Sequence, residues 1–232
     1  MAENIIITRE VSKYYNRGKA NEVLAVNNVS AEIRRGDFAV IKGPSGSGKT
    51  SLLSLIGCMS RPTSGSIFLE GQDVSHLPER FLTGIRRKTY GFIFQQFHLI
   101  KGLNVLENVM APLYSTDISV SDLRQRAEAI LEDLGMTKRR NFQVQGISGG
   151  EQQRTAIARA LINDPEIILA DEPTAHLDTA LSKDFMAIMK EFRKSGKTVV
   201  IASHYPLVYE DPGISLIIGM RDGTVTDITG KD

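Results

Sequence analysis

The segment GPSGSGKTS, residues 43–51, constrains the fold of this chain more than any other part of its sequence. Immediately before it stands the short apolar run FAVIK, which is typical of a buried strand. Immediately after it, KTSLLSLIG places Leu52, Leu53 and Ile56 at the spacing of one helix face. The sequence therefore predicts a strand, a glycine-rich loop and a helix in direct succession.

The loop has the composition of a phosphate-binding turn. It fits the pattern G-x-x-x-x-G-K-[ST], in which backbone N–H groups and a helix N-terminus surround phosphate oxygens, the lysine reaches the β- and γ-phosphates, and the final hydroxyl ligates Mg²⁺. Such a match arises by chance in roughly one protein in a hundred, so we predict nucleotide binding. The pattern alone does not choose between kinase, GTPase, helicase and transporter ATPase. The residues expected to bind the nucleotide are Gly43, Pro44, Ser45, Gly46, Ser47, Gly48, Lys49, Thr50 and Ser51.

Strand-like and helix-like segments alternate along most of the chain. Two β-rich pieces, residues 5–11 and 23–33, open it and are expected to pair in antiparallel fashion. Helical patterns at 78–89, 150–162 and 180–194 then lie between several later strands, an order that predicts an α/β fold with a mainly parallel sheet, the core of a P-loop NTPase. The later strand-like segments are FAVIKG, SIFLEG, YGFIFQ, EIILAD, KTVVIAS and ISLIIG.

The region between Gln95 and Asn163 is almost wholly helical in pattern. In SVSDLRQRAEAILEDLG, Ser119 and Asp122 suggest a capping box and Gly135 a helix stop. We therefore expect one domain, residues 1–232, in which 1–95 and 163–232 form a RecA-like core with an antiparallel β subdomain, and 96–162 form an inserted helical subdomain. The residues expected on the buried face of its long helix are Val120, Leu123, Ala127, Ile130, Leu131 and Leu134.

Composition narrows the possible partners and compartment. The 28 basic and 27 acidic residues leave a net charge of +1, so no overall field attracts nucleic acid, and no nucleic-acid partner is expected. The single cysteine, Cys58, fits a reducing compartment and a buried position. The first residues lack the basic start and apolar stretch of a signal peptide, and no apolar run reaches the length of a membrane helix. We expect the chain to be cytosolic.

A pair of carboxylates follows a second buried strand. In IILADEP, residues 167–173, an apolar run delivers Asp171 and Glu172 to the carboxyl edge of the sheet, where ligands bind in such folds. We predict that Asp171 is a partner of Mg²⁺ and that Glu172 is the general base that activates water. A solvated acidic turn is the alternative, and the phosphate loop makes it the weaker one.

The segment ISGGEQQR, residues 147–154, supplies a second helix N-terminus suited to an anion. Its position after the phosphate loop and before the carboxylates resembles the signature motif of ATP-binding cassette proteins, usually written LSGGQ. The resemblance covers nearly the whole chain. Ile147 and Glu151 depart from the usual leucine and glutamine. The signature residues carried over are Ser148, Gly149, Gly150 and Glu151.

The resemblance implies roles for residues that mean little singly. Tyr15 matches the aromatic residue that stacks on adenine, although Tyr14 adjoins it and could serve instead. Gln95 matches the Q-loop glutamine and His204 the switch histidine. The implied catalytic residues are Glu172, His204 and Gln95, and the implied Mg²⁺ ligands are Thr50, Gln95 and Asp171. The D-loop is AHLD, residues 175–178, with an unusual Ala175-His176 pair followed by Leu177 and Asp178.

The same resemblance implies a mechanism and partners. Cassette ATPases bind MgATP in a head-to-tail homodimer, in which the phosphate loop of one copy and the signature helix of the other enclose ATP. The segments NRGKANEVLAV, GFIFQQFHLI and LNVLENVMAPL resemble subunits of lipoprotein-releasing and macrolide-export transporters. An integral-membrane permease is then the partner, at the cytoplasmic face of the inner (plasma) membrane of a bacterium, with Leu99 and Ile100 as candidate contacts.

Two other readings remain open at this point. A cassette ATPase acting on DNA or ribosomes would carry a long coiled-coil insertion or a second cassette, and neither is present in this sequence. A cassette protein of a soluble assembly scaffold is disfavoured only by the resemblance to the transporter subfamily.

Overall fold

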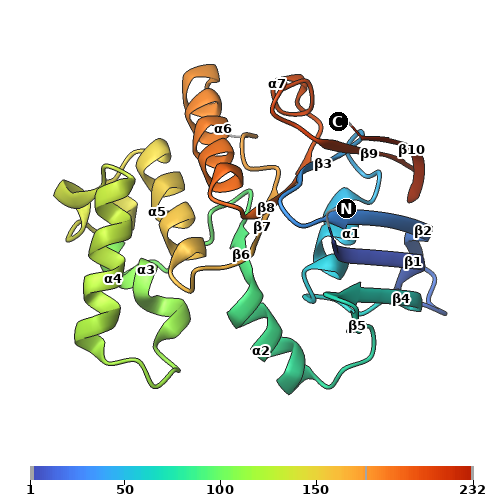
Figure 1. Cartoon of the computed structure of the whole chain (residues 1–232), viewed down its shortest axis with the longest axis horizontal. Helices are drawn as coiled ribbons and strands as arrows, with labels where there is room; N and C mark the ends of the chain where they lie inside the picture. Colours follow the sequence, from blue (N-terminus) through green and yellow to red (C-terminus); the bar gives the residue numbers. More distant parts are fainter. Residues whose placement is uncertain (1–2, 176, 231–232) are drawn as a thin grey trace.

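The computed structural model describes residues 3–175 and 177–230, and the strands within these ranges form two sheets. A mainly parallel sheet lies in the middle of the molecule, with an antiparallel sheet on one side and a group of helices on the other (Figure 1). This is the arrangement that the alternation of strands and helices predicts.

The central sheet has the order β10-β9-β3-β8-β7-β6 among the described residues, and neighbouring strands are parallel except for the β9–β10 pair. Its inner strands are nearly continuous apolar runs because both faces of a parallel sheet are covered. The strands are β3 (Phe38–Lys42), β6 (Tyr90–Ile93), β7 (Ile167–Asp171), β8 (Thr198–Ser203), β9 (Leu216–Arg221) and β10 (Thr224–Gly230).

Strand β3 shows how the two faces are covered. Phe38 and Val40 lie in one hydrophobic cluster with the helix α6 (Thr179–Lys194), whereas Ala39 and Ile41 lie in another with α1 (Lys49–Ile56). Successive strand side chains point to opposite faces, so each face of β3 packs on a different helix. The phosphate-binding loop is thus held between a buried strand and a buried helix.

The antiparallel sheet has the order β2-β1-β4-β5 and includes one strand that was expected elsewhere. The first four residues of the segment SIFLEG lie in β4, which pairs antiparallel with β1 and not with the parallel sheet. Its burial alternates along the strand, unlike the inner parallel strands, because one of its faces meets solvent. The strands are β1 (Asn4–Tyr15), β2 (Val23–Arg34), β4 (Ser64–Leu69) and β5 (Gln72–Asp73).

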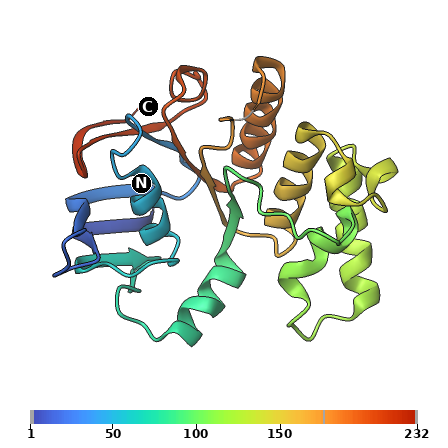
Figure 2. The same ribbon diagram turned by 180° about the vertical axis from the view of Figure 1, so that it is seen from behind.

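Strand β10 was not predicted at all. Its sequence, TVTDITG, is largely polar, and it folds back on β9 through the turn at Asp222–Gly223. The resulting hairpin lies alongside β2, next to the antiparallel sheet (Figure 2). The hairpin therefore connects the two sheets on the side where the phosphate-binding loop emerges.

The helices between β6 and β7 form a lobe on the far side of the central sheet (Figure 1). This helical lobe consists of α3 (Val105–Met110), α4 (Val120–Asp133) and α5 (Gly149–Leu161), with the short 3₁₀ turns Ala111–Leu113, Thr137–Arg139 and Val144–Gly146. Elsewhere, α2 (Glu79–Thr89) precedes β6 and α7 (Pro206–Tyr209) follows β8. No helix in the described ranges combines the length and apolar character needed to cross a membrane.

Helix α4 begins after Ser119 and ends before Gly135 as predicted, but Ser119 and Asp122 form only the Ser119 half of the predicted capping box, and one apolar residue is placed differently. Ser119 caps it by accepting a hydrogen bond from the N–H of Asp122, and Gly135 ends it with a φ of +68°. Leu123 is buried at 2% exposure, but Val120 is 70% exposed, so its assignment to the buried face was wrong. Val120 is the first residue of the helix, and its side chain faces solvent although its spacing matches the buried residues.

The different burial of Leu123 and Val120 predicts that shortening each side chain to alanine changes the free energy of unfolding by different amounts. Leu123→Ala should lower the free energy of unfolding by about 2–5 kcal/mol, because it removes a buried side chain and leaves a cavity. Val120→Ala should change it by no more than about 0.5 kcal/mol, because the side chain is exposed. Urea denaturation of both variants measures the difference, and equal destabilisation would contradict the packing of α4.

Candidate nucleotide site

The glycine-rich loop lies in a cavity of about 530 Å³ beside the start of α1. Gly43 and Gly48 have φ values of +157° and +98°, which L-residues rarely adopt. A Cβ at Gly48 would come within 2.3 Å of the carbonyl oxygen of Ala25, so a side chain has no room there. The residues that line the cavity are Val23, Leu24, Ala25, Ser45, Gly46, Ser47, Gly48, Lys49, Thr50, Ser51, Gln95, Glu172, His204, Asp222 and Gly223.

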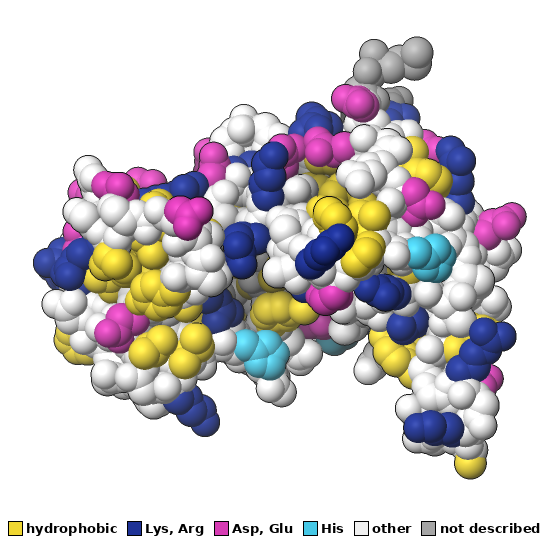
Figure 3. All heavy atoms as spheres, turned by 90° about the horizontal axis from the view of Figure 1, so that it is seen from below, with side chains coloured by type: hydrophobic (Ala, Val, Ile, Leu, Met, Phe, Trp, Pro, Cys, Tyr) yellow, Lys and Arg dark blue, Asp and Glu magenta, His cyan; other side chains and the backbone are white. Residues whose placement is uncertain are grey.

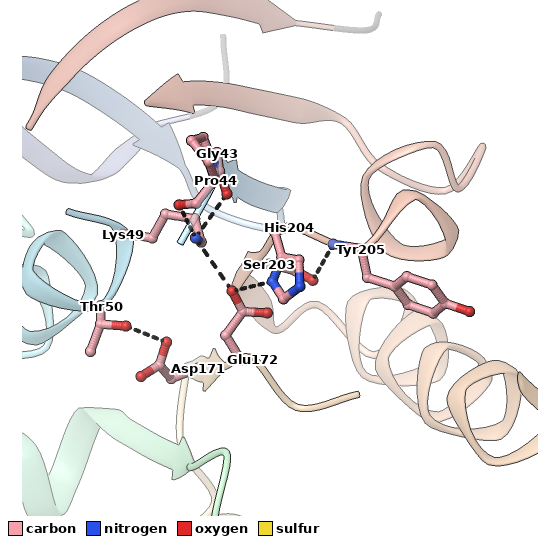
Figure 4. Close-up of polar contacts among 9 residues, drawn as sticks. All are labelled: Gly43, Pro44, Lys49, Thr50, Asp171, Glu172, Ser203, His204 and Tyr205. Atoms are coloured by element: carbon pink, nitrogen blue, oxygen red, sulfur yellow. Dashed lines mark hydrogen bonds and ion pairs between the residues drawn. The ribbon is translucent and has the colours of Figure 1, made fainter. Parts of the chain in front are cut away.

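Lys49 is almost completely buried, with 5% of its side chain exposed. Its Nζ donates hydrogen bonds to the carbonyl oxygens of Gly43 at 2.8 Å and Pro44 at 2.9 Å. It also lies 3.3 Å from Oε1 of Glu172 (Figure 4). The backbone of the loop itself thus positions the ammonium group, which is the group suited to β- and γ-phosphate oxygens.

Thr50 and Asp171 form a second polar pair in the same region. The Thr50 hydroxyl donates to Oδ1 of Asp171 at 2.9 Å (Figure 4). Burial raises the pKa of the Asp171 carboxyl above its usual value, and the hydrogen bond from Thr50 opposes that rise. A hydroxyl and a carboxylate at this distance provide the oxygen ligands that Mg²⁺ prefers when phosphates complete its shell. The residues present therefore fit a magnesium ion.

Glu172 has an unusual backbone conformation directly after β7. Its φ is +43°, in the left-handed region that non-glycine residues rarely adopt and that is found at functional sites. Its Oε1 lies 2.9 Å from Nδ1 of His204 as well as close to Lys49 (Figure 4). The turn away from the strand thus separates Glu172 from Asp171, so that the two carboxylates contact different partners.

Gln95 lines this cavity, and the two candidate tyrosines lie on a strand next to its lining. Gln95 stands two residues after the end of β6. Tyr14 and Tyr15 pair across the strands with Leu24 and Val23, and both of those partners line the cavity. The register brings both tyrosines near the site and does not choose between them.

Sequence reasoning missed the backbone segments that complete the cavity. Val23 to Ala25 and the turn Asp222–Gly223 line it, and the N–H of Gly223 donates to the carbonyl oxygen of Ser47 at 3.1 Å. A glycine after aspartate indicates a turn, but nothing in the sequence indicates that this turn contacts the phosphate-binding loop.

The signature segment lies apart from this cavity, at the start of α5 on the helical lobe, and contributes nothing to its lining. Ser148 caps α5, and Glu151 completes a capping box. Buried Gln153, whose role was also missed, donates to the carbonyl oxygen of Pro173 at 2.8 Å and so ties α5 to the turn after β7.

The D-loop residue Asp178 caps α6 by accepting a hydrogen bond from the N–H of Leu181 at 2.8 Å. His176, the unusual member of the same loop, lies outside the described residues. The observed role of Asp178 is therefore that of a helix cap, and its contacts across a dimer stay a prediction.

The profile of the ABC transporter family matches residues 26–175, which is most of the chain and includes the phosphate loop and the signature segment. The chain belongs to the ABC transporter family. The cassette is therefore an ATP-binding protein and an ATPase of that family.

Some curated relatives are about as long as this chain, and others are about three times as long. The macrolide export ATP-binding/permease protein MacB of Hyphomonas neptunium is 40% identical over the whole of this chain, which spans 35% of that protein. An uncharacterized ABC transporter ATP-binding protein, MJ1508 of Methanocaldococcus jannaschii, is 40% identical and covers 98% of this chain and 100% of its own. The cassette thus corresponds to the full length of some relatives and to about a third of others.

Solved structures of the cassette MJ0796 share the fold. Its dimeric structure has a TM-score of 0.88 and 40% identity, covering 97% of this chain and 98% of that one. A second dimeric structure, in a post-hydrolysis state bound to ADP and Pi, has the same TM-score at 39% identity. These comparisons confirm the predicted fold class, with its antiparallel β subdomain, mainly parallel sheet and helices.

The raised pKa of Asp171 predicts that its ionised carboxylate lowers the free energy of unfolding of the nucleotide-free protein. Asp171→Asn should make the nucleotide-free protein more stable at neutral pH, by less than about 1 kcal/mol because the group is partly exposed. The folded state binds the Asp171 proton more tightly than the unfolded state does. The cost of the ionised carboxylate should therefore disappear as the pH falls through the raised pKa, and the advantage of the asparagine should disappear with it.

Urea denaturation at neutral and acidic pH measures this effect. Asp117→Asn, at an exposed carboxylate, is the matched control and should show no comparable gain. An Asp171→Asn variant that is less stable than wild type at neutral pH would show that the ionised carboxylate stabilises the fold.

Proposed function

We propose that the cassette hydrolyses MgATP in a head-to-tail dimer and that this cycle drives a separate membrane permease. The proposal rests on the separate locations of the two segments suited to binding an anion. The phosphate loop lines the cavity, whereas Ser148 lies on the helical lobe. One chain therefore supplies two half-sites. A second copy in head-to-tail orientation completes both.

Each side chain around the cavity has a separate role in phosphoryl transfer to water. Lys49 neutralises the β- and γ-phosphates, and Gln95 and His204 position the γ-phosphate and the attacking water. Glu172, the general base, accepts a proton from that water as it attacks. Because the bond to the leaving ADP breaks in the same displacement, hydrolysis removes the γ-phosphate that joins the two copies.

Thr50, Asp171 and Gln95 are the residues that would hold magnesium. Magnesium bound by them would supply positive charge that offsets the negative charge developing on the phosphates. Tyr15, or Tyr14 beside it, stacks on adenine in this proposal.

The ATP-joined dimer is tested by Glu172→Gln. Glutamine keeps the shape of the side chain and removes the base, so hydrolysis should fall by about a hundredfold or more while ATP still binds. The variant should then accumulate as a dimer with ATP and as a monomer without it. Light scattering coupled to size-exclusion chromatography measures both states.

A second substitution tests the role of Ser148 in the same experiment. Adding Ser148→Arg to Glu172→Gln should prevent the ATP-dependent dimer without preventing ATP binding, since Ser148 serves the site of the other copy. Adding Lys49→Ala should weaken ATP binding itself. If the Glu172→Gln variant hydrolyses ATP at the wild-type rate, the general base lies elsewhere.

A groove between α2 and α5 is the proposed contact with the permease. It has a volume of about 420 Å³ and opens on the face that α2 borders, where hydrophobic, basic and histidine side chains lie close together near the middle (Figure 3). The rings of Phe92 and Phe94 stack at 6.0 Å between centroids, and His98 meets Phe94 edge-on at 5.2 Å. Arg86, Arg87 and Arg159 also line the groove, which suits a cytoplasmic helix with apolar and acidic residues.

The groove adjoins the nucleotide site through the segment after β6. Phe94 lines the groove and the next residue, Gln95, lines the cavity. Arg159 of α5 donates to the carbonyl oxygens of Phe97 and His98, each at 2.5 Å, and so attaches this segment to the helical lobe. Of the two contacts expected from the sequence, Ile100 is 47% exposed, whereas Leu99 packs against the core of the lobe.

The partner's location and cargo follow from this proposal and from the relatives. A permease partner places the cassette at the cytoplasmic face of a bacterial inner membrane. The whole transporter is proposed to export a macrolide or a peptide or to release a lipoprotein; the relatives named macrolide export proteins support the first of these, and the sequence resemblance suggests the other two.

Phe94→Ala tests the groove. Loss of an aromatic anchor from the centre of an interface typically costs about 2 kcal/mol, so copurification in detergent with a coexpressed permease partner should fall by roughly thirtyfold. Tyr114→Ala, which removes an exposed aromatic side chain outside the groove lining, is the control. Equal copurification of wild type and Phe94→Ala would exclude this groove as the docking surface.

A further inference from the structure

The Ser148 hydroxyl is already engaged within its own helix. It accepts a hydrogen bond from the N–H of Glu151 at 3.3 Å and donates to Oε2 of Glu151 at 3.0 Å. The N–H of Ser148 donates to the same carboxylate oxygen at 2.9 Å. Since a hydroxyl has one hydrogen to donate, this hydrogen serves either Glu151 or another anion, and not both.

Glu151 forms an ion pair with Arg139, the last residue of the 3₁₀ turn Thr137–Arg139. Nε of Arg139 donates to Oε1 of Glu151 at 2.6 Å, and the guanidinium lies over the ring of Phe142 at 4.9 Å. The hydrogen bond from Arg139 is the main cause of a lowered pKa of the Glu151 carboxyl. The carboxylate beside Ser148 is therefore charged at neutral pH, and its charge is balanced by Arg139.

We propose that Glu151 is an internal anion that competes with the γ-phosphate of the partner copy's ATP for the Ser148 hydroxyl, and that Arg139 is the positioning residue that limits this competition. The inference rests on the proposed head-to-tail dimer. Arg139 acts through Glu151: it draws the carboxylate by its other oxygen and cancels the charge that would repel the triphosphate. Glu151 and Arg139 thereby determine how much ATP is needed to close the dimer.

Glu151 can be replaced by glutamine without loss of the helix cap. A capping box accepts glutamine in place of glutamate, so Glu151→Gln keeps the bond to the Ser148 N–H. It replaces a charged acceptor by a neutral one, and charge-assisted hydrogen bonds are roughly twice as strong as neutral ones. The glutamine should therefore release the Ser148 hydroxyl more readily and remove the repulsion of the γ-phosphate.

The experiment is a double-mutant cycle in the Glu172→Gln background. The quantity measured is the ATP concentration at half-maximal dimerisation, by light scattering, with Glu151 or Gln at position 151 and with or without Arg139→Ala. Glu151→Gln should lower this concentration by about three- to tenfold. Arg139→Ala should raise it by a similar factor when Glu151 is present and change it by less than about twofold when it is glutamine.

Steady-state ATPase assays with Glu172 intact separate this role from a structural one. Arg139→Ala should raise the ATP concentration for half-maximal rate and leave the maximal rate unchanged, and Arg139→Lys should recover part of the loss. Arg124→Ala is the matched control, because Arg124 pairs with Glu128 on the exposed face of α4 in a similar ion pair away from Ser148. It should leave dimerisation and ATPase activity at wild-type values.

Two results would overturn the inference. If Arg139→Ala weakens dimerisation equally with glutamate and glutamine at position 151, Arg139 does not act through Glu151. If Glu151→Gln weakens dimerisation, the carboxylate assists closure and does not compete with phosphate. A Glu172→Gln variant that never dimerises with ATP overturns the proposed dimer, and this inference with it, whereas a dimer without coupling between positions 139 and 151 overturns this inference alone.

Discussion

The geometry of the site depends on the contacts that the buried Lys49 ammonium makes with its neighbours. A charge with 5% exposure needs partners, because an unpaired charge in a protein interior is strongly destabilising. Its partners come from the loop itself, through the carbonyls of Gly43 and Pro44, and from Glu172 after β7. The loop therefore has to curl around its own lysine, and β7 has to end beside it. The same contacts that stabilise the charge hold Lys49 and Glu172, the proposed phosphate-binding group and general base, within reach of one another.

The curled loop in turn requires both sheets. A Cβ at Gly43 would come within 2.2 Å of the carbonyl oxygen of Met220 on β9, and one at Gly48 would come within 2.3 Å of that of Ala25 on β2. The two glycines are thus pressed between the central sheet and the antiparallel sheet, and Gly223 of the β9–β10 turn donates to the loop at Ser47. The antiparallel strands and the C-terminal hairpin are therefore walls of the nucleotide cavity as well as parts of the fold.

Sequence patterns predicted the parts of this arrangement that depend on side-chain chemistry or periodicity. They predicted the phosphate loop, the carboxylates after β7 and the helices of the lobe, and the comparisons confirm the family and the fold. They missed β10 and the turn at Asp222–Gly223, since contacts between backbone atoms of distant segments have no side-chain signature. They assigned β4 to the wrong sheet because an apolar run does not reveal which strand it will pair with. Val120 was misplaced because helical spacing does not show where the covering layer ends.

The two anion-binding N-termini of this fold differ in how they are satisfied. At α1, the loop before the helix has no acidic side chain, and Lys49 adds a positive charge at its first helical turn. At α5, the cap is Ser148 and the first turn contains Glu151, whose carboxylate accepts the bonds that a phosphate oxygen would accept. An N-terminus with its own carboxylate is stable in the single chain, because the negative charge complements the helix dipole. It binds an external anion only by giving up part of that stabilisation. In the proposed dimer, such a helix would make the ATP-dependent contact reversible, since each opening would restore the internal hydrogen bonds of the cap.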